Sequence, residues 1–200
     1  MKGSWKTLAA FVSVGFMLVF VAASAGGTGT GNGDFERGDL TNWNEVDTGG
    51  GIWETYSGNT TPLIGIPFYK PPQGTFAATT EQEAPSQMVL YRSLPLGFSK
   101  TQQVSFYLYY QQDGLDFSPG LQEYRIDILR DGSDPTSTDP GDILKTLFIT
   151  NPGDKLTMKP KLMTYVLKHL SGSVIIRFMV TVEFTELNAG LDKLKLQSAS

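Results

Sequence analysis

Two stretches far apart in the chain decide the fold: Asn32-Gly33-Asp34-Phe35-Glu36-Arg37-Gly38-Asp39-Leu40-Thr41-Asn42-Trp43 near its start, and Ala189-Gly190-Leu191-Asp192-Lys193-Leu194-Lys195-Leu196 near its end. Each is a short apolar alternation that carries a carboxylate, Glu36 or Asp192, among turn-forming residues. Paired as neighbouring strands, the two stretches would close a single domain.

The first 25 residues are typical of a secretory signal peptide. Lys2 and Lys6 precede an uncharged apolar run, and Ala23-Ser24-Ala25 gives the small-x-small pattern that signal peptidase accepts. We therefore predict a secreted protein, extracellular or periplasmic. The alternative is an uncleaved anchor, because the eighteen residues 8–25 just suffice to span a bilayer. The small residues that end the run favour cleavage.

The composition of the remaining chain limits its partners. Removing residues 1–25 leaves fourteen basic and twenty acidic residues, a net charge of −6. This acidity argues against nucleic acid or an anionic membrane surface as a partner, since either would require a basic face. The chain has no cysteine, so packing, with or without a metal, must stabilise it in place of disulfides. An export signal without cysteine fits a bacterial protein.

A period of two residues recurs along the chain and predicts half-buried antiparallel strands. With 33 glycines and prolines separating the segments, the pattern indicates an all-β sandwich or barrel. The best candidate for a helical turn is residues 165–170. The clearest strands are expected at residues 88–96, 104–111, 124–130 and 174–184, with shorter ones at 44–47, 52–56 and 75–79.

The domain organisation follows from these segments. We expect a signal peptide at residues 1–25, a flexible Gly/Thr leader at 26–31 and one domain over 32–198. Residues 61–74 contain four prolines, which remove backbone donors, so this part should form a long surface loop. No internal repeat or second domain is visible.

The two terminal stretches together resemble those of a known group. An N-G-D-F-E-x-G-x-L-x-x-W motif at residues 32–43 and a G-L-D-x-L-x-L motif at 190–196 are similar to the ends of galactose-binding-like jelly-roll domains. The group includes many bacterial carbohydrate-binding modules. The resemblance implies a two-sheet antiparallel β-sandwich of jelly-roll topology. Weaker internal matches cover most of the chain in the same order: residues 76–78, 88–94, 124–129, 150–154 and 170–178.

Catalytic chemistry has few candidate residues. The single histidine, His169, lies outside any nucleophile motif, and no G-x-S-x-G occurs. A glycosidase needs only two facing carboxyl groups, for which Glu123 and Glu183 are available. Because exposed acidic residues on strands are usually only solvated, we expect no enzymatic activity and keep a small glycosidase as the weaker alternative.

The resemblance also implies a structural calcium ion, which would be held by Glu36, the backbone carbonyl of Asp34 and Asp192. Alternatively, Glu36 and Asp192 cap turns or pair with Arg37 and Lys193. The acidic segment 131–142 lacks the spacing and the closing glutamate of a calcium loop, so we interpret it as a solvated turn.

Ligand binding is expected at two tyrosines, Tyr107 and Tyr109, which alternate with the apolar Phe106 and Leu108. Sugars stack on aromatic rings beside charged or amide groups. The alternative is that the tyrosines pack across strands or beneath a loop. Polar partners are expected from Arg125, Arg177 and Glu183, further aromatic contacts from Trp53 and Tyr56, and a core position for Trp43.

These observations favour a secreted, non-catalytic carbohydrate-binding domain with a calcium site. The alternative is an extracellular protein-interaction module of the same fold.

Overall fold

The structure, a computed structural model, describes residues 31–97 and 101–199. The predicted signal peptide and all of the leader except Gly31 therefore lie outside the described residues. Over the described ranges the chain forms strands and connections but no helix, which confirms the all-β prediction. None of this part has a helix that could cross a membrane.

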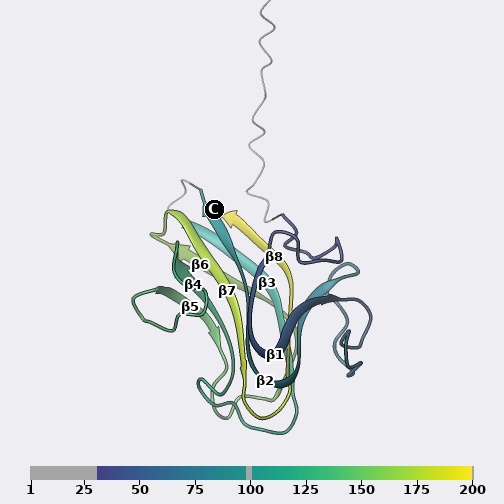
Figure 1. The fold of residues 1–200 in the computed structure, drawn as a ribbon. Coiled ribbons are helices and arrows are strands. Elements are labelled where there is room, and N and C mark those ends of the chain that lie inside the picture. The colour runs from purple at the N-terminus through teal and green to yellow at the C-terminus, as the bar shows by residue number, and fades with distance from the viewer. Residues whose placement is uncertain (1–30, 98–100, 200) are drawn as a thin grey trace, which may run out of the picture.

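Eight strands make up the domain (Figure 1). Every pair of neighbouring strands is antiparallel. The strands are β1 (Asn44–Tyr56), β2 (Ala77–Leu96), β3 (Thr101–Gln112), β4 (Gln122–Arg130), β5 (Ile143–Ile149), β6 (Thr157–Lys168), β7 (Gly172–Val182) and β8 (Leu187–Ser198).

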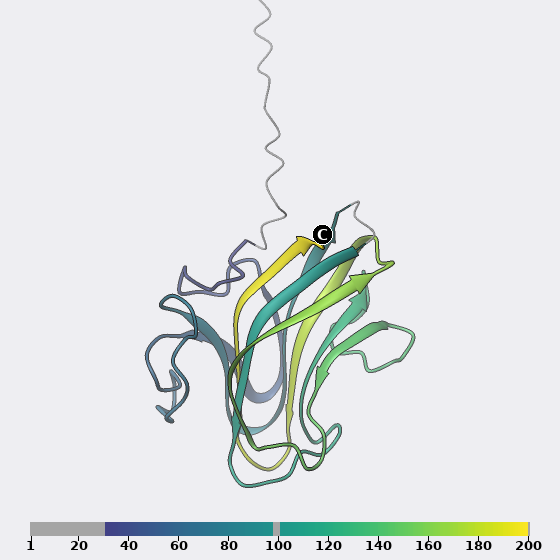
Figure 2. The ribbon, with the colours of Figure 1, turned by 180° about the vertical axis from the view of Figure 1, so that it is seen from behind.

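The strands form one continuous hydrogen-bonded sheet, in the order β5-β4-β7-β2-β8-β3-β6, that folds into two layers. β2 belongs to both layers because its first residues pair with β8 and residues 86–96 pair with β7. β1 follows β2 along both parts. Figure 2 shows β6, β3 and β8 crossing over the layer that contains β4 and β7. The predicted two-layer antiparallel sandwich is thus confirmed.

The core lies between the two layers, where the alternating apolar residues of β3 and β7 meet. The rings of Phe106 and Phe178 pack edge to face with centroids 5.2 Å apart. Trp43 stacks on Phe35 and also contacts Phe178. With 8 % of its surface exposed, Trp43 is a core residue, as the sequence predicted.

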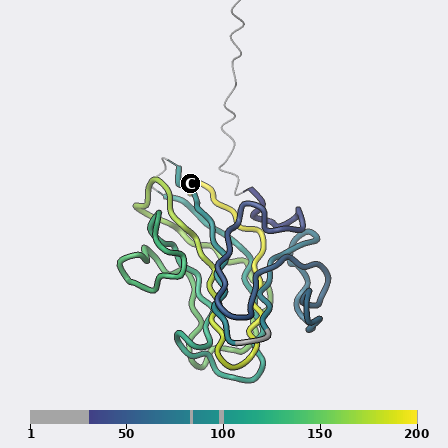
Figure 3. Tube along the Cα trace, in the orientation of Figure 1, coloured from purple at the N-terminus to yellow at the C-terminus, as the bar shows by residue number. Residues whose placement is uncertain are grey.

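The two ends of the domain lie side by side, as the sequence predicted, but residues 32–43 form turns and not the strand that the prediction paired with the last one. The backbone N–H of Leu194 donates to the carbonyl of Gly33 at 2.7 Å. Figure 3 shows the purple start of the described chain beside the yellow C-terminal strand. The opening segment therefore rests on β8 and adds Phe35 and Trp43 to the core.

Several segments differ from the sequence prediction. Residues 165–170 are no helical turn, because β6 runs to Lys168 and pairs with β3. The two short strands expected around the glycines are one strand, β1, with a register shift between Gly49 and Gly51. A side chain at either glycine would overlap β2, so these residues permit close approach there and do not end the strand.

Candidate functional site

At the junction of the chain ends, the carboxylates of Glu36 and Asp192 both contact one short segment, residues 73–76. The Glu36 carboxylate accepts hydrogen bonds from the backbone N–H groups of Thr75, at 2.9 Å, and Phe76, at 3.1 Å. Oδ2 of Asp192 accepts from the N–H of Gln73 at 3.1 Å. Gly74 has φ +65° and lies against Glu36 so closely that a Cβ there would overlap the carboxylate.

Asp192 is fully buried, and burial raises the pKa of its carboxyl to about 7, with a further contribution from the negative charge of Glu36. Among the described residues, its Oδ1 has no hydrogen-bond partner. The salt bridges of the described chain all involve Asp127 or Glu123, so neither junction carboxylate forms one there. Lys193 instead donates to Oε1 of Gln73.

The junction suits a hard cation in its chemistry, since a buried carboxylate oxygen without a partner and a second carboxylate nearby are oxygen ligands that calcium accepts. Asp34 is exposed beside them. Within residues 31–97 and 101–199, no three acidic, histidine or cysteine side chains group as metal ligands, so backbone carbonyls would have to complete a site.

The structure separates the two predicted platform tyrosines. Tyr107 is partly exposed on the outer face of β3, whereas Tyr109, on the same side of the strand, has 0 % of its surface exposed. Residues 57–76, called here the covering segment, lie over Tyr109. The ring of Phe68 from this segment is 5.4 Å from that of Tyr109.

Tyr56 belongs to the same buried cluster. Its hydroxyl donates to the carbonyl of Tyr69 at 2.6 Å and lies 2.7 Å from the hydroxyl of Tyr109. Trp53 is also buried, with 2 % of its surface exposed, and packs near Tyr124 in the main core. The prediction that Tyr109 binds ligand on the open sheet face, with Tyr56 and Trp53 as further aromatic contacts, is therefore wrong, because the covering segment and the core enclose all three residues.

The two predicted arginines serve a buried ion-pair network. Nη2 of Arg177 lies 2.8 Å from Oδ2 of Asp127, and both side chains are fully buried. Arg177 also donates to the carbonyls of Pro135 and Ser137, which ties the acidic segment 131–142 to the sheet. Arg125 pairs with Asp127 on the same strand. Arg177 is therefore structural, and the prediction that it faces a ligand is wrong.

The open part of the outer sheet face surrounds Tyr107. A shallow hollow there is lined by Ser105, Tyr107, Leu162, Lys193, Lys195 and Gln197. The hydroxyl of Tyr107 accepts from Nε2 of Gln73 at 3.4 Å. The hollow thus combines one aromatic ring with cationic and amide groups of β8.

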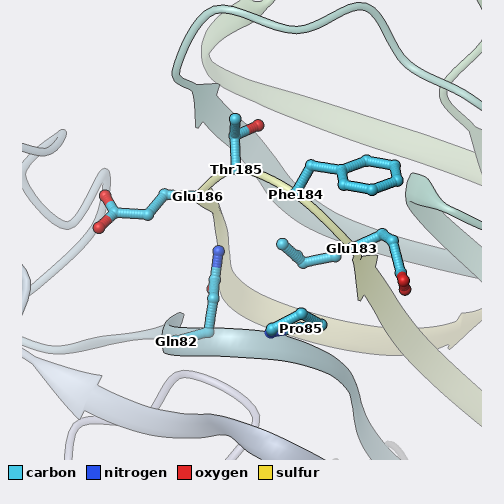
Figure 4. A pocket seen from close by; sticks show the side chains of 7 residues that line it. Gln82, Pro85, Glu183, Phe184, Thr185 and Glu186 are labelled. Carbon is cyan, nitrogen blue, oxygen red and sulfur yellow. The ribbon is translucent and has the colours of Figure 1, made fainter.

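The two carboxylates considered for catalysis, those of Glu123 and Glu183, lie in different surroundings. Glu123 is buried, where it pairs with Arg125 at 3.6 Å and accepts from the N–H of Gly120. Glu183 is exposed in the turn after β7, beside a separate pocket that Figure 4 shows. The exposed His169 begins the turn between β6 and β7.

No motif in the sequence marks Phe184 or Gln82 as part of that pocket. Phe184 falls within the strand that the sequence predicts over residues 174–184, but β7 ends at Val182. Gln82 has no neighbouring motif. Only the meeting of β2 with the 183–186 turn brings these two residues together.

Comparison with known proteins gives a fold and no family. No protein-family model matches the sequence, and no curated protein matches it. Among solved structures, the module TmCBM61 in complex with β-1,4-galactotriose superposes with a TM-score of 0.53 at 12 % identity, over 84 % of this chain and 96 % of that one. The chain therefore shares the antiparallel β-sandwich fold of this module.

Two other similar structures are an adhesin domain and a tailspike domain. The K3 cleaved adhesin domain of Lys-gingipain from Porphyromonas gingivalis gives a TM-score of 0.52 at 17 % identity, over 83 % of this chain and 97 % of that one. The enzymatically active domain of bacteriophage CBA120 tailspike protein 4 gives 0.51 at 11 % identity, over 84 % of this chain but 21 % of that one. At these identities the likeness concerns the fold alone.

Proposed function

We propose that this protein is a secreted, non-catalytic domain that binds carbohydrate on the outer face of β6, β3 and β8, around Tyr107. The observation that carries the proposal is that Tyr107 is the predicted platform aromatic that remains accessible, in a hollow that Ser105, Lys193, Lys195 and Gln197 also line. The fold, which TmCBM61 shares, supports the same reading.

The chemistry of the hollow suits a pyranose ring. The face of the Tyr107 ring can stack on sugar C–H groups, while neighbouring side chains bond to hydroxyls. Ser105 and Gln197 supply both donors and acceptors, and Lys193 and Lys195 supply donors. No carboxylate lines this hollow as described, so a sugar with an acidic group would also be accepted.

Binding to a glycan array and titration calorimetry test this proposal. Replacing Tyr107 by alanine should weaken binding about tenfold, the effect of losing roughly 1.4 kcal/mol of stacking, whereas Tyr107→Phe should keep most of the affinity. An array without any signal above background would refute the proposal, as would an affinity that Tyr107→Ala leaves unchanged.

A protein-interaction role for the same face is the second candidate. Leu162 is 53 % exposed beside Tyr107, and an exposed apolar residue next to an aromatic is common in protein contacts. Leu162→Ser separates the two roles, because it should abolish a protein contact while leaving sugar stacking on Tyr107 largely intact.

We further propose a structural calcium ion at the junction of the chain ends, with Glu36, Asp192 and the carbonyl of Asp34 as ligands. The unpaired, buried Oδ1 of Asp192 supports this assignment. A bound ion would supply positive charge to two neighbouring carboxylates and would tie the first and last segments together.

A melting experiment tests the ion. At a calcium concentration one hundred times its Kd, the ion would stabilise the fold by about 2.7 kcal/mol. A chelator should therefore lower the melting temperature, calcium should restore it, and Asp192→Asn should remove the response. A melting temperature that changes with neither chelator nor calcium would refute the proposed calcium site.

A further inference from the structure

A pocket at the end of the sandwich away from the C-terminus has no role in the proposed function. It lies where the turn between β7 and β8 meets β2, and its volume is about 130 Å³. Figure 4 shows Gln82 projecting from β2 toward this turn, with Phe184 and Glu183 to one side and Glu186 to the other. The lining residues are Gln82, Pro85, Val182, Glu183, Phe184, Thr185 and Glu186.

Gln82 supplies unused hydrogen-bonding capacity. Its side chain is 4 % exposed, and neither Nε2 nor Oε1 has a hydrogen-bond partner in the described parts of the chain. An unpaired buried amide costs about 1–3 kcal/mol, so a buried amide without a partner in the protein bonds to ordered water or to a ligand that displaces it. An amide that offers a donor and an acceptor side by side matches two adjacent hydroxyl groups.

Phe184 supplies an apolar surface beside this amide. It is 70 % exposed, the largest exposed fraction among the large apolar residues of the described chain. Exposure of a phenyl ring to water is unfavourable, and covering the ring with a ligand would lower the free energy. Its ring remains available to stack on a ligand that enters the pocket.

The charges of the pocket restrict what this ligand can be. Glu183 and Glu186 would repel an anionic ligand. Burial, followed by the negative charges of Asp113 and Glu81, raises the pKa of Glu186. A bare cation could satisfy Oε1 of Gln82 but would leave Nε2 unpaired. A neutral molecule that carries hydroxyl groups satisfies both atoms and meets no repulsion.

Further unpaired acceptors lie on the other side of Glu186. This residue also lines a second hollow with Gln112 and Asn188. Both amides are buried, and Oε1 of Gln112 and Oδ1 of Asn188 lack partners among residues 31–97 and 101–199. A ligand longer than one ring could therefore place hydroxyl donors on both sides of Glu186.

We infer that this pocket is a second ligand site, which binds an uncharged pyranose within an oligosaccharide. Phe184 stacks on the ring and Gln82 bonds to two adjacent hydroxyls. The inference goes beyond the proposed function because it uses none of the residues around Tyr107, and it would stand if that face bound nothing.

Nuclear magnetic resonance titration of the full chain tests the site with three probes: cellotriose, xylotriose and the anionic trigalacturonate. At least one neutral probe should shift the side-chain Nε2 signal of Gln82. Phe184→Ala and Gln82→Met should each weaken that binding about tenfold. Leu63→Ala, which truncates another exposed apolar residue at 63 % exposure, is the matched control and should change the affinity less than twofold.

Three outcomes would overturn the inference: neither neutral probe shifts the Gln82 signal, trigalacturonate binds the pocket as tightly as they do, or Phe184→Ala and Gln82→Met both bind like the unchanged protein. Signals of Lys193 and Gln197 report the face around Tyr107 in the same spectra. Failure of one site is therefore distinguishable from failure of the other.

Discussion

Tyr107 and Tyr109 lie two residues apart on the same side of β3, yet one is accessible and the other is enclosed. Alternation along the strand places both on the outer face of the sheet. The covering segment then encloses Tyr109 with Phe68 and leaves Tyr107 beside Lys193. In a sandwich with long connections, the loops that lie over a sheet face decide which of its residues can meet a ligand.

The largest effect on the enclosure of Tyr109 is expected from removing the ring that covers it. Phe68 is 7 % exposed and contacts Tyr56, Tyr69 and Tyr109. Phe68→Ala should lower the free energy of unfolding by about 3 kcal/mol, measured by urea denaturation. Leu63→Ala, an exposed residue of the same segment, should change it by less than about 0.5 kcal/mol. Equal effects of the two variants would mean that the covering segment is not packed on the sheet.

The attachment of the covering segment at its C-terminal end can be tested with two glycines. Gly74 and Gly65 have nearly equal positive φ values, +65° and +68°, but only Gly74 lies against another group, the Glu36 carboxylate. Replacement of either by alanine should cost about 1 kcal/mol of backbone strain. Gly74→Ala should cost about 1 kcal/mol more because the new Cβ displaces Glu36. Identical melting temperatures for the two variants would contradict this close contact.

Near its N-terminal end, the covering segment is attached through a pH-dependent pair. Glu81 accepts from the N–H groups of Leu63, at 2.6 Å, and Ile64, at 2.7 Å, and lies beside Glu54. Burial, followed by the hydrogen bond to Glu81 and the charge of that residue, raises the pKa of Glu54 to about 7.

Because this pKa is higher in the folded protein than in the unfolded chain, the folded state binds more protons between about pH 4 and 7. The contribution of Glu54 to stability is therefore complete below about pH 4 and is lost as the pH rises to 7. Glu54→Gln should reduce the difference in unfolding free energy between about pH 4 and pH 7 by about 1 kcal/mol. The plot of unfolding free energy against pH should then be flatter. A variant with the same pH dependence as the unchanged protein would show that Glu54 titrates normally.

The smallest effect on stability is expected from removing the hydroxyl group of Tyr109 or of Tyr107. Tyr109→Phe removes the hydroxyl that lies 2.7 Å from that of Tyr56 and should cost about 0.5–1 kcal/mol. Tyr107→Phe removes only a long contact with Gln73, at 3.4 Å, and should cost less than about 0.5 kcal/mol. Urea denaturation of the two variants measures the difference, and a larger loss at Tyr107 would reverse our interpretation.

The sequence predicted those parts of the fold in which one side of a strand is buried. The period of two located β3, β4 and β7, because their inward residues are apolar throughout. It failed at β6, an edge strand that points Leu162 outward and Met163 inward and so carries apolar residues on both sides. It also missed β5, whose seven residues pair only with β4.

The candidate site was predictable only where a local motif marked it. The terminal motifs located Glu36 and Asp192, both of which accept hydrogen bonds from residues 73–76. No local pattern distinguishes Tyr109 from Tyr107, since Phe68 lies about forty residues away in the chain. Arg177 was misassigned for a similar reason, because its partner Asp127 is on the neighbouring strand.

The bond between Gly33 and Leu194 has a consequence for biosynthesis. Because β1 to β7 lie between Gly33 and Leu194 in the chain, the opening segment can pair with β8 only after all seven of these strands have been synthesised. Such distant pairing slows folding and leaves the edges of β2 and β3 unprotected meanwhile. We therefore expect the newly synthesised chain to depend on chaperones until β8 has left the ribosome and paired with β2 and β3.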